Sequence, residues 1–251
     1  MNIIHSENYE DMSIKAGTLI VEKIRSKPSL TIGLATGSTP KGVYQFLIKD
    51  RLEKGTSYNR VKTVNLDEYI GLPHDDHNSY HYFMQHQFFN HVNLVPEHTH
   101  IPNGVASDLG KECLRYDQLI KDLGGIDLQI LGIGQNGHIG FNEPGTSFSS
   151  STHIVTLADS TRLANSRFFN SLDEVPTHAI TMGIKSILAS KEICLLASGA
   201  AKADALYKLL YGEISENFPA SALKLHPNVT IIADKEALIK LEALILSAKE
   251  C

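Results

Sequence analysis

The sequence has few cysteines and no long apolar run, and each absence excludes a class of protein. Its three cysteines, Cys113, Cys194 and Cys251, are odd in number and widely spaced, which disfavours a disulfide framework or a zinc ribbon. No stretch approaches the roughly 18 apolar residues of a membrane span, and residues 1–10 lack the basic start of an export signal. We therefore expect reduced thiols, no membrane partner and a cytoplasmic protein.

A strong charge imbalance is also missing. The formal net charge is −5, so the chain has no general attraction for nucleic acid, and an anionic ligand must be held by a few placed cations. This favours a small-molecule substrate. The 251 residues are 42% hydrophobic and contain no low-complexity tract or linker, which predicts one globular domain over residues 1–251.

A repeated order of strand, loop and helix is present instead. An amphipathic helix opens the chain, with Met12 and Ile24 on its apolar side, and short apolar runs follow. Strands of such uniform hydrophobicity are covered on both faces, so we predict an α/β fold with a doubly wound, mostly parallel sheet of the Rossmann-like type. A helix is expected at 80–89, within the longest stretch without a strand, 71–102. The predicted strands are 30–35, 61–66, 126–131, 193–197 and 229–233.

The first strand ends in Thr36, Gly37, Ser38 and Thr39, and a helix is predicted from about Lys41. Backbone N–H groups, hydroxyls and a helix N-terminus there indicate an anion site, and Gly37 allows close backbone approach. A simple capped helix start is the alternative, and no Gly-Lys-Ser/Thr closes the loop as in a P-loop.

The second strand ends in Asp67 and Glu68, two carboxylates at the mouth of the predicted sheet. A buried structural role for both would be costly, so one of them is a candidate general base. Adjacent residues of a strand point to opposite sides, and we expect the two not to act on one atom. A solvated acidic pair is the alternative.

The third strand leads into a glycine-rich loop that carries Asn136, His138 and Glu143. Its glycines match the dinucleotide pattern, but turn residues replace the helix that this pattern requires, so we expect no dinucleotide. A histidine oriented by a nearby carboxylate is a proton shuttle near neutral pH. The alternative is a structural histidine.

Cations and histidines complete the candidates. Arg162, Arg167 and Lys202 follow later elements and could each bind a phosphate. Seven histidines crowd the segment 74–100, but no thiolate accompanies them and their spacing fits no zinc pattern, so we expect a polar surface and no metal.

Five segments together resemble the glucosamine-6-phosphate deaminase family over nearly the whole chain, and the Gly-His-Ile-Gly-Phe-Asn-Glu-Pro stretch is the most specific. The segments are 34–40, 65–69, 132–144, 165–169 and 219–226. The resemblance implies ring opening of an amino-sugar phosphate, proton transfer from C2 to C1 through an enediol, and release of ammonia, with no cofactor.

The resemblance also implies residue roles. Asp67 takes the C2 proton, and His138, oriented by Glu143, opens the ring. Many members carry Asp where this chain has Asn136, which is expected to hold His138 by a hydrogen bond. The phosphate is expected to be bound by Thr36, Gly37, Ser38, Thr39, Arg167 and Lys202, with Glu68 supporting the neighbouring loop of the substrate site.

Two other functions stay open at this point. A 6-phosphogluconolactonase resembles the family in fold and loops, although Phe141-Asn142-Glu143-Pro144 argues against it. A non-catalytic sugar-phosphate sensor is the second, although it would need neither Asp67 nor His138, and no DNA-binding segment is recognised. The oligomeric state is left open.

Overall fold

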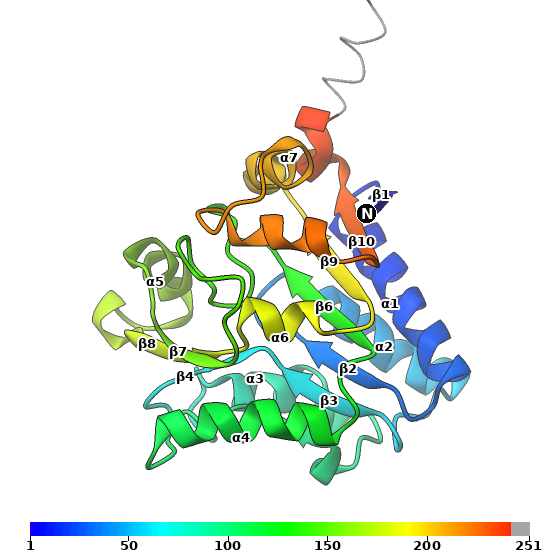
Figure 1. The fold of residues 1–251 in the computed structure, drawn as a ribbon. Helices are drawn as coiled ribbons and strands as arrows, with labels where there is room; N and C mark the ends of the chain where they lie inside the picture. Colours follow the sequence, from blue (N-terminus) through cyan, green and yellow to red (C-terminus); the bar gives the residue numbers. More distant parts are fainter. Residues whose placement is uncertain (242–251) are drawn as a thin grey trace, which may run out of the picture.

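In the computed structural model, which describes residues 1–241, a seven-stranded sheet forms the centre of the molecule (Figure 1). Its order is β1-β10-β9-β6-β2-β3-β5, and every pair is parallel. The predicted doubly wound fold is thus confirmed. The strands are β1 (Asn2–Ser6), β2 (Thr31–Leu34), β3 (Lys62–Asn65), β5 (Thr99–His100), β6 (Leu128–Gly132), β9 (Ile193–Ala197) and β10 (Val229–Asp234).

Helices cover both faces of this sheet. In Figure 1, α1 and α2 lie on one side of it, and α6 and α7 on the other. The helices are α1 (Tyr9–Ser26), α2 (Lys41–Lys54), α3 (Tyr80–Gln87), α4 (Leu109–Asp122), α5 (Asp159–Asn165), α6 (Ile184–Leu188) and α7 (Ala203–Tyr211). Short 3-10 helices are η1 (Phe89–His91), η2 (Pro96–His98), η3 (Ser166–Phe168), η4 (Leu172–Glu174), η5 (Ala200–Lys202) and η6 (Pro219–Leu225).

Side chains of successive strand residues point to opposite faces of the sheet, so the apolar core forms two layers. In β2, Ile32 and Leu34 face the layer formed with α1, α2 and α3, where Met12 and Ile24 are also buried. In β6, Leu131 faces the opposite layer, formed with α4, α6 and α7. Strands buried on both faces explain the uniform apolar runs of the sequence.

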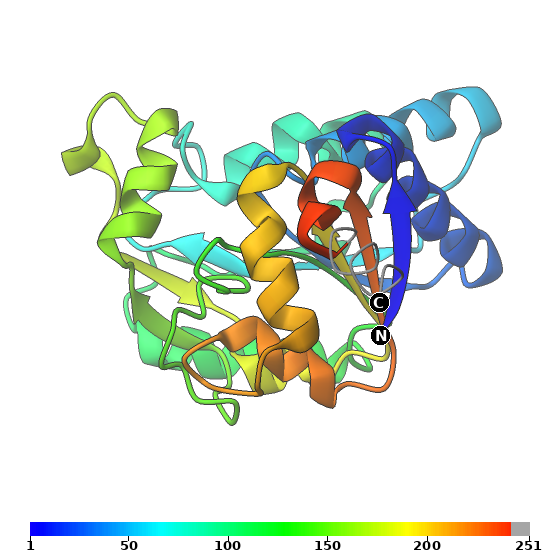
Figure 2. The same cartoon turned by 90° about the horizontal axis from the view of Figure 1, so that it is seen from above.

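A second, antiparallel sheet was not predicted from the sequence. It has the order β4-β8-β7, with β4 (Asp67–Tyr69), β7 (His153–Thr156) and β8 (His178–Thr181). Figures 1 and 2 show β7, β8 and α5 together at the end of the molecule away from β1. The pairing of β4 with β8 makes Asp67 part of a strand instead of a loop.

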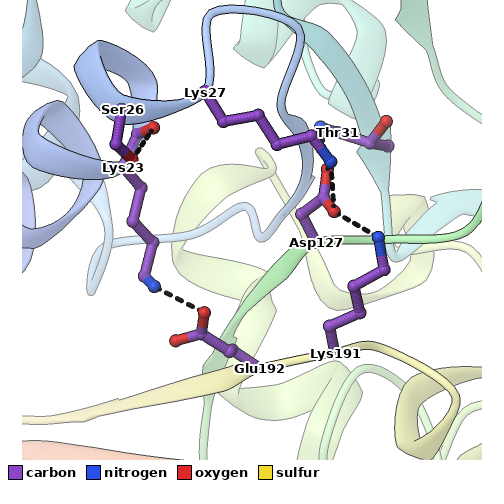
Figure 3. Close-up of polar contacts among 7 residues, drawn as sticks. All are labelled: Lys23, Ser26, Lys27, Thr31, Asp127, Lys191 and Glu192. Atoms are coloured by element: carbon purple, nitrogen blue, oxygen red, sulfur yellow. Dashed lines mark hydrogen bonds and ion pairs between the residues drawn. The ribbon is translucent and has the colours of Figure 1, made fainter.

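Ion pairs connect the segments that precede the central strands, at the amino ends of the parallel strands (Figure 3). Asp127, just before β6, accepts from Nζ of Lys27 at 2.6 Å, Nζ of Lys191 at 2.7 Å and the N–H of Thr31 at 2.9 Å. Burial raises the pKa of Asp127, but these donors outweigh it and lower the pKa to about 2. These ion pairs lie opposite the carboxyl ends of the strands.

Other sequence expectations concern the chain as a whole. Cys113 and Cys194 are free and buried, as expected for reduced thiols. Within residues 1–241, no helix has the length and apolar character needed to span a bilayer. Cys251 and the last part of the predicted domain, residues 242–251, lie outside the described residues.

Candidate active site

A cavity of about 580 Å³ opens at the carboxyl ends of the parallel strands. Its walls come from the segments that follow β2, β3, β6 and β9, together with α3 and the segment 160–168. Ligands of doubly wound sheets bind at this edge. Nine of the twelve candidate residues line these walls. Those that line the cavity are Thr36, Gly37, Ser38, Thr39, Asp67, Asn136, His138, Arg167 and Lys202.

The loop after β2 has the geometry of an anion site. Gly37 has a φ of +94°, which L side chains rarely adopt, and the space where its Cβ would lie is open. The 14-residue helix α2 begins at Lys41, as predicted, and directs its N-terminus at the loop. The hydroxyl of Tyr9 donates to the Ser38 carbonyl at 2.9 Å and accepts from the Gly42 N–H at 2.8 Å, which fixes the loop.

Two of the three candidate cations lie beside this loop. Nη2 of Arg167 donates to Oγ of Ser38 at 3.3 Å, and Nζ of Lys202 donates to the Ile133 carbonyl at 2.7 Å. Burial lowers the pKa of Lys202, and the charge of Arg167 adds to this effect. Arg162 instead donates to the carbonyls of Leu172 and Val175, so it holds its own segment together.

Asp67 and Glu68 point to different places, as their positions in one strand predict. Asp67 lines the cavity, whereas Glu68 is absent from its walls. The Glu68 carboxylate accepts the N–H groups of Tyr69 at 2.8 Å and of Tyr80 and His81 at 2.9 Å. Glu68 thus holds the N-terminus of α3 and does not itself line the cavity. Burial of both carboxylates, 6% and 0% exposed, departs from the sequence expectation.

Burial dominates the titration of both carboxyl groups. It raises the pKa of Asp67 to about 8, and the neighbouring Glu68 charge adds to the rise. It raises the pKa of Glu68 to about 7, although three N–H donors partly offset the effect. A carboxyl with a pKa near neutrality is suited to general acid–base chemistry.

His138, Glu143 and Asn136 form a second acid–base group. Nδ1 of His138 is buried without a hydrogen bond and lies 3.7 Å from Oε2 of Glu143. Nδ2 of Asn136 donates to that same Glu143 oxygen at 2.7 Å, and Oδ1 of Asn136 accepts the His138 backbone N–H at 3.2 Å. Asn136 therefore makes the expected hydrogen bond with His138, through the backbone N–H, and it also positions the Glu143 carboxylate. Thr161 donates to the other Glu143 oxygen.

The environment of His138 favours a neutral imidazole. Burial lowers the pKa of His138, Glu143 opposes this, and Lys202 adds to the decrease. The ring lies against Gly134, where a Cβ would be 2.3–2.5 Å from ring atoms. The glycine-rich loop therefore makes room for a histidine. Residues 133–152, all within the described chain, contain no helix, so the loop lacks the helix that the dinucleotide pattern requires.

Several cavity residues escaped the sequence interpretation. Tyr80, Phe141 and Asn165 line the cavity. The two aromatic residues do not differ in sequence from ordinary core residues. The histidines of segment 74–100 lie around α3, where the rings of His74 and His81 stack at 3.8 Å. Among residues 1–241, no cluster of three or more His, Cys, Asp or Glu side chains could hold a metal ion.

The fold and the cavity define a class: a doubly wound α/β protein with a cavity at the carboxyl ends of its strands, lined by a loop at a helix N-terminus and by carboxyl, imidazole and cationic side chains. The family model described as "Glucosamine-6-phosphate isomerases/6-phosphogluconolactonase" matches residues 7–232. The chain belongs to this family.

The similar proteins of high identity carry the first of the two activities in this description. A glucosamine-6-phosphate deaminase of Halalkalibacterium halodurans is 59% identical, over 96% of this chain and 98% of that protein. Glucosamine-6-phosphate deaminase 1 of Bacillus subtilis is 54% identical, over 94% and 98%. The solved structure of a monomeric glucosamine-6-phosphate deaminase is 54% identical, with a TM-score of 0.93 over 94% of this chain and 98% of that one.

A structure that carries the second activity is less similar in sequence. The structure of 6-phosphogluconolactonase from Trypanosoma cruzi has a TM-score of 0.76 and 20% identity, over 94% of this chain and 95% of that one. At this identity the likeness extends to the fold alone.

Proposed function

We propose that this chain is a cytoplasmic deaminase that converts glucosamine 6-phosphate and water to fructose 6-phosphate and ammonia. The observation that carries the proposal is that Asp67 and His138 face one cavity with the loop of residues 36–39. The names of the 53–59% identical relatives support the same substrate. The overall reaction is redox-neutral, so we propose that it uses no cofactor.

The phosphate group is bound at the start of α2. The hydroxyls and N–H groups of residues 36–39 and the helix N-terminus surround its oxygens, and Arg167 and Lys202 supply the positive charge. A lysine with a lowered pKa gains most from an adjacent dianion, because the anion restores its charged form. Binding at this end places the sugar carbons over the strand ends.

Ring opening falls to His138. A neutral imidazole accepts the proton of the C1 hydroxyl and then passes a proton to the ring oxygen, which leaves an aldehyde at C1. The Glu143 carboxylate, 3.7 Å from Nδ1, stabilises the imidazolium that forms in between. Asn136 and Thr161 hold both oxygens of that carboxylate in place.

Deamination then falls to Asp67. The carboxylate removes the C2 proton, and the C2 ammonium gives a proton to the aldehyde oxygen, which leaves a planar enolamine with nitrogen still attached to C2. Asp67 then returns its proton to C1, so that C1 carries a hydroxyl and C2 an imine. The resulting C2 imine adds water and releases ammonia. The C2 ammonium of the bound substrate stabilises an ionised Asp67, which offsets the raised pKa of the empty site.

The test is a product assay with two substrates. The purified protein is expected to release equimolar ammonia and fructose 6-phosphate from glucosamine 6-phosphate, and to leave 6-phosphogluconolactone hydrolysis at the background rate. Lactone hydrolysis without ammonia release would assign the cavity to the other branch of the family. Tight binding of glucosamine 6-phosphate without turnover would make the protein a sensor.

A further inference from the structure

Tyr69, the residue that ends β4, occupies a connecting position next to the cavity. Its side chain is 2% exposed and is absent from the cavity walls. Its hydroxyl accepts from Nδ2 of Asn165 at 2.9 Å, and its ring lies 4.8 Å from the ring of Tyr80. Tyr80 in turn lines the cavity together with Thr36. Tyr69 therefore connects Asn165, by a hydrogen bond, to the cavity wall at Tyr80, by a ring contact.

These contacts lie between two parts of the phosphate site. Thr36 begins the loop of residues 36–39, whereas Asn165 is the last residue of α5 and precedes Arg167 by two residues. The direct contact between Arg167 and Ser38 is long, at 3.3 Å. The side chain of Arg167 is exposed, so the position of its segment depends on contacts deeper in the protein.

The ring of Tyr69 is held independently of its hydroxyl. Ring centroids lie 4.8 Å from Tyr80, 5.6 Å from Phe141 and 5.9 Å from Phe169. Phenylalanine at position 69 would keep these contacts and lose only the polar connection. The aromatic cluster thus supplies packing, and the Tyr69 hydroxyl supplies the bond to Asn165.

We propose that Tyr69 is a positioning residue that, through its hydrogen bond with Asn165, fixes the Arg167 segment beside the loop of residues 36–39 and so sets the affinity for the substrate's phosphate group. Tyr69 acts through Asn165 and does not touch the substrate. The proposal rests on the phosphate-binding part of the proposed function. It does not depend on the deamination step.

The test uses Tyr69→Phe with inorganic phosphate as the probe. One neutral hydrogen bond corresponds to about a 2- to 12-fold change in an equilibrium constant, so phosphate binding by calorimetry should weaken by that factor. KM for glucosamine 6-phosphate should rise equally, with kcat changed less than about twofold. As a control, Tyr58→Phe removes a buried hydroxyl near the Leu47 carbonyl, 3.4 Å away, and should leave phosphate affinity unchanged.

A double-mutant cycle decides whether the Asn165 contact carries the effect. Asn165→Ala should weaken phosphate binding, and adding Tyr69→Phe to it should cause less further loss than Tyr69→Phe causes alone. Fully additive losses, or unchanged phosphate affinity with a reduced kcat, would overturn the proposal. Because calorimetry needs no turnover, failure of the deaminase assignment would appear separately, as normal phosphate binding without ammonia release.

Discussion

At Asp67, burial and catalysis make opposite demands on one carboxyl group. Burial shields the reacting carbon from water, but it raises the pKa of Asp67 to about 8 and so disfavours the ionised form that accepts a proton. The folded protein therefore keeps a destabilised group at the centre of its cavity. This conflict has consequences for stability and for the pH profile.

Asp67→Asn is expected to stabilise the fold at neutral pH. The pKa of about 8 exceeds the ordinary aspartate value, so the stability contributed by the proton is full below about pH 4 and is lost as pH rises through 8. Asparagine stays neutral, and the free energy of unfolding at pH 7 should rise by about 2 kcal/mol. Urea unfolding at pH 7 and pH 4 measures this. An equal gain at both pH values would contradict the assignment of the pKa.

The activity of the free enzyme should follow the same carboxyl group. We expect kcat/KM to rise with pH through about 8, far above an ordinary aspartate, because Asp67 must lose its proton. Glu68→Gln removes the neighbouring negative charge and should move this limb to lower pH. The substrate's own ionisations are common to both proteins and cancel in the ratio of their kcat/KM values. If the rise of kcat/KM with pH occurs at the same pH in both proteins, another group titrates.

At the scale of single elements, the glycine-rich loop is shaped around one side chain. Gly134→Ala would place a methyl group 2.3–2.5 Å from the His138 ring, so the imidazole must move away from Glu143. We expect kcat to fall about 10-fold or more with little loss of Tm, because the backbone there needs no positive φ. Gly110→Ala in α4, whose added Cβ meets an ordinary contact at 3.5 Å, is the control. Full activity of Gly134→Ala would mean that His138 need not occupy this position.

The ion pairs of Asp127, at the amino ends of the strands, are expected to contribute to stability and not to catalysis. Asp127 has a pKa lowered to about 2, so its contribution is present above about pH 4 and is lost as pH falls through 2. Lys27 and Lys191 are about half exposed, which weakens the pairs, and we expect Asp127→Asn to cost about 1 kcal/mol at pH 7. Unfolding measured from pH 7 down to pH 2 should show the difference disappear, with kcat unchanged throughout the active range. A constant difference would point to packing instead of charge.

Sequence reasoning identified the elements whose residues carry an unambiguous pattern. The run 193–197 is a strand with the predicted limits, and α2 begins at the predicted Lys41, because buried parallel strands and helix starts have strong local signals. The edge strands β1 and β5 and the strands β4, β7 and β8 were missed. They are short and contain polar residues, and their pairing partners lie far away in the sequence.

The candidate site shows the same division. Residues that follow the strands, such as Asp67 and His138, could be found because parallel strands bring their ends together. The role of Glu68 as the anchor of α3 could not be found, since it depends on a helix that begins 12 residues later. The hydrogen bond between Tyr69 and Asn165 joins residues 96 positions apart, so it could not be found from the sequence either.

At the scale of the whole molecule, the two apolar layers on the faces of the sheet fix the positions of the strands. The ion pairs of Asp127 lie at the amino ends of the strands, and the cavity lies at their carboxyl ends. The central claim is that this cavity deaminates glucosamine 6-phosphate with Asp67 as the base for the C2 proton.

The most direct measurement is ammonia release by Asp67→Asn compared with its affinity for glucosamine 6-phosphate. An amide keeps the shape of the side chain but cannot accept the proton, so kcat should fall by about 10²-fold or more. Binding measured by calorimetry should persist, because the phosphate loop, Arg167 and Lys202 are untouched. Near-normal ammonia release by a folded Asp67→Asn protein would contradict the account.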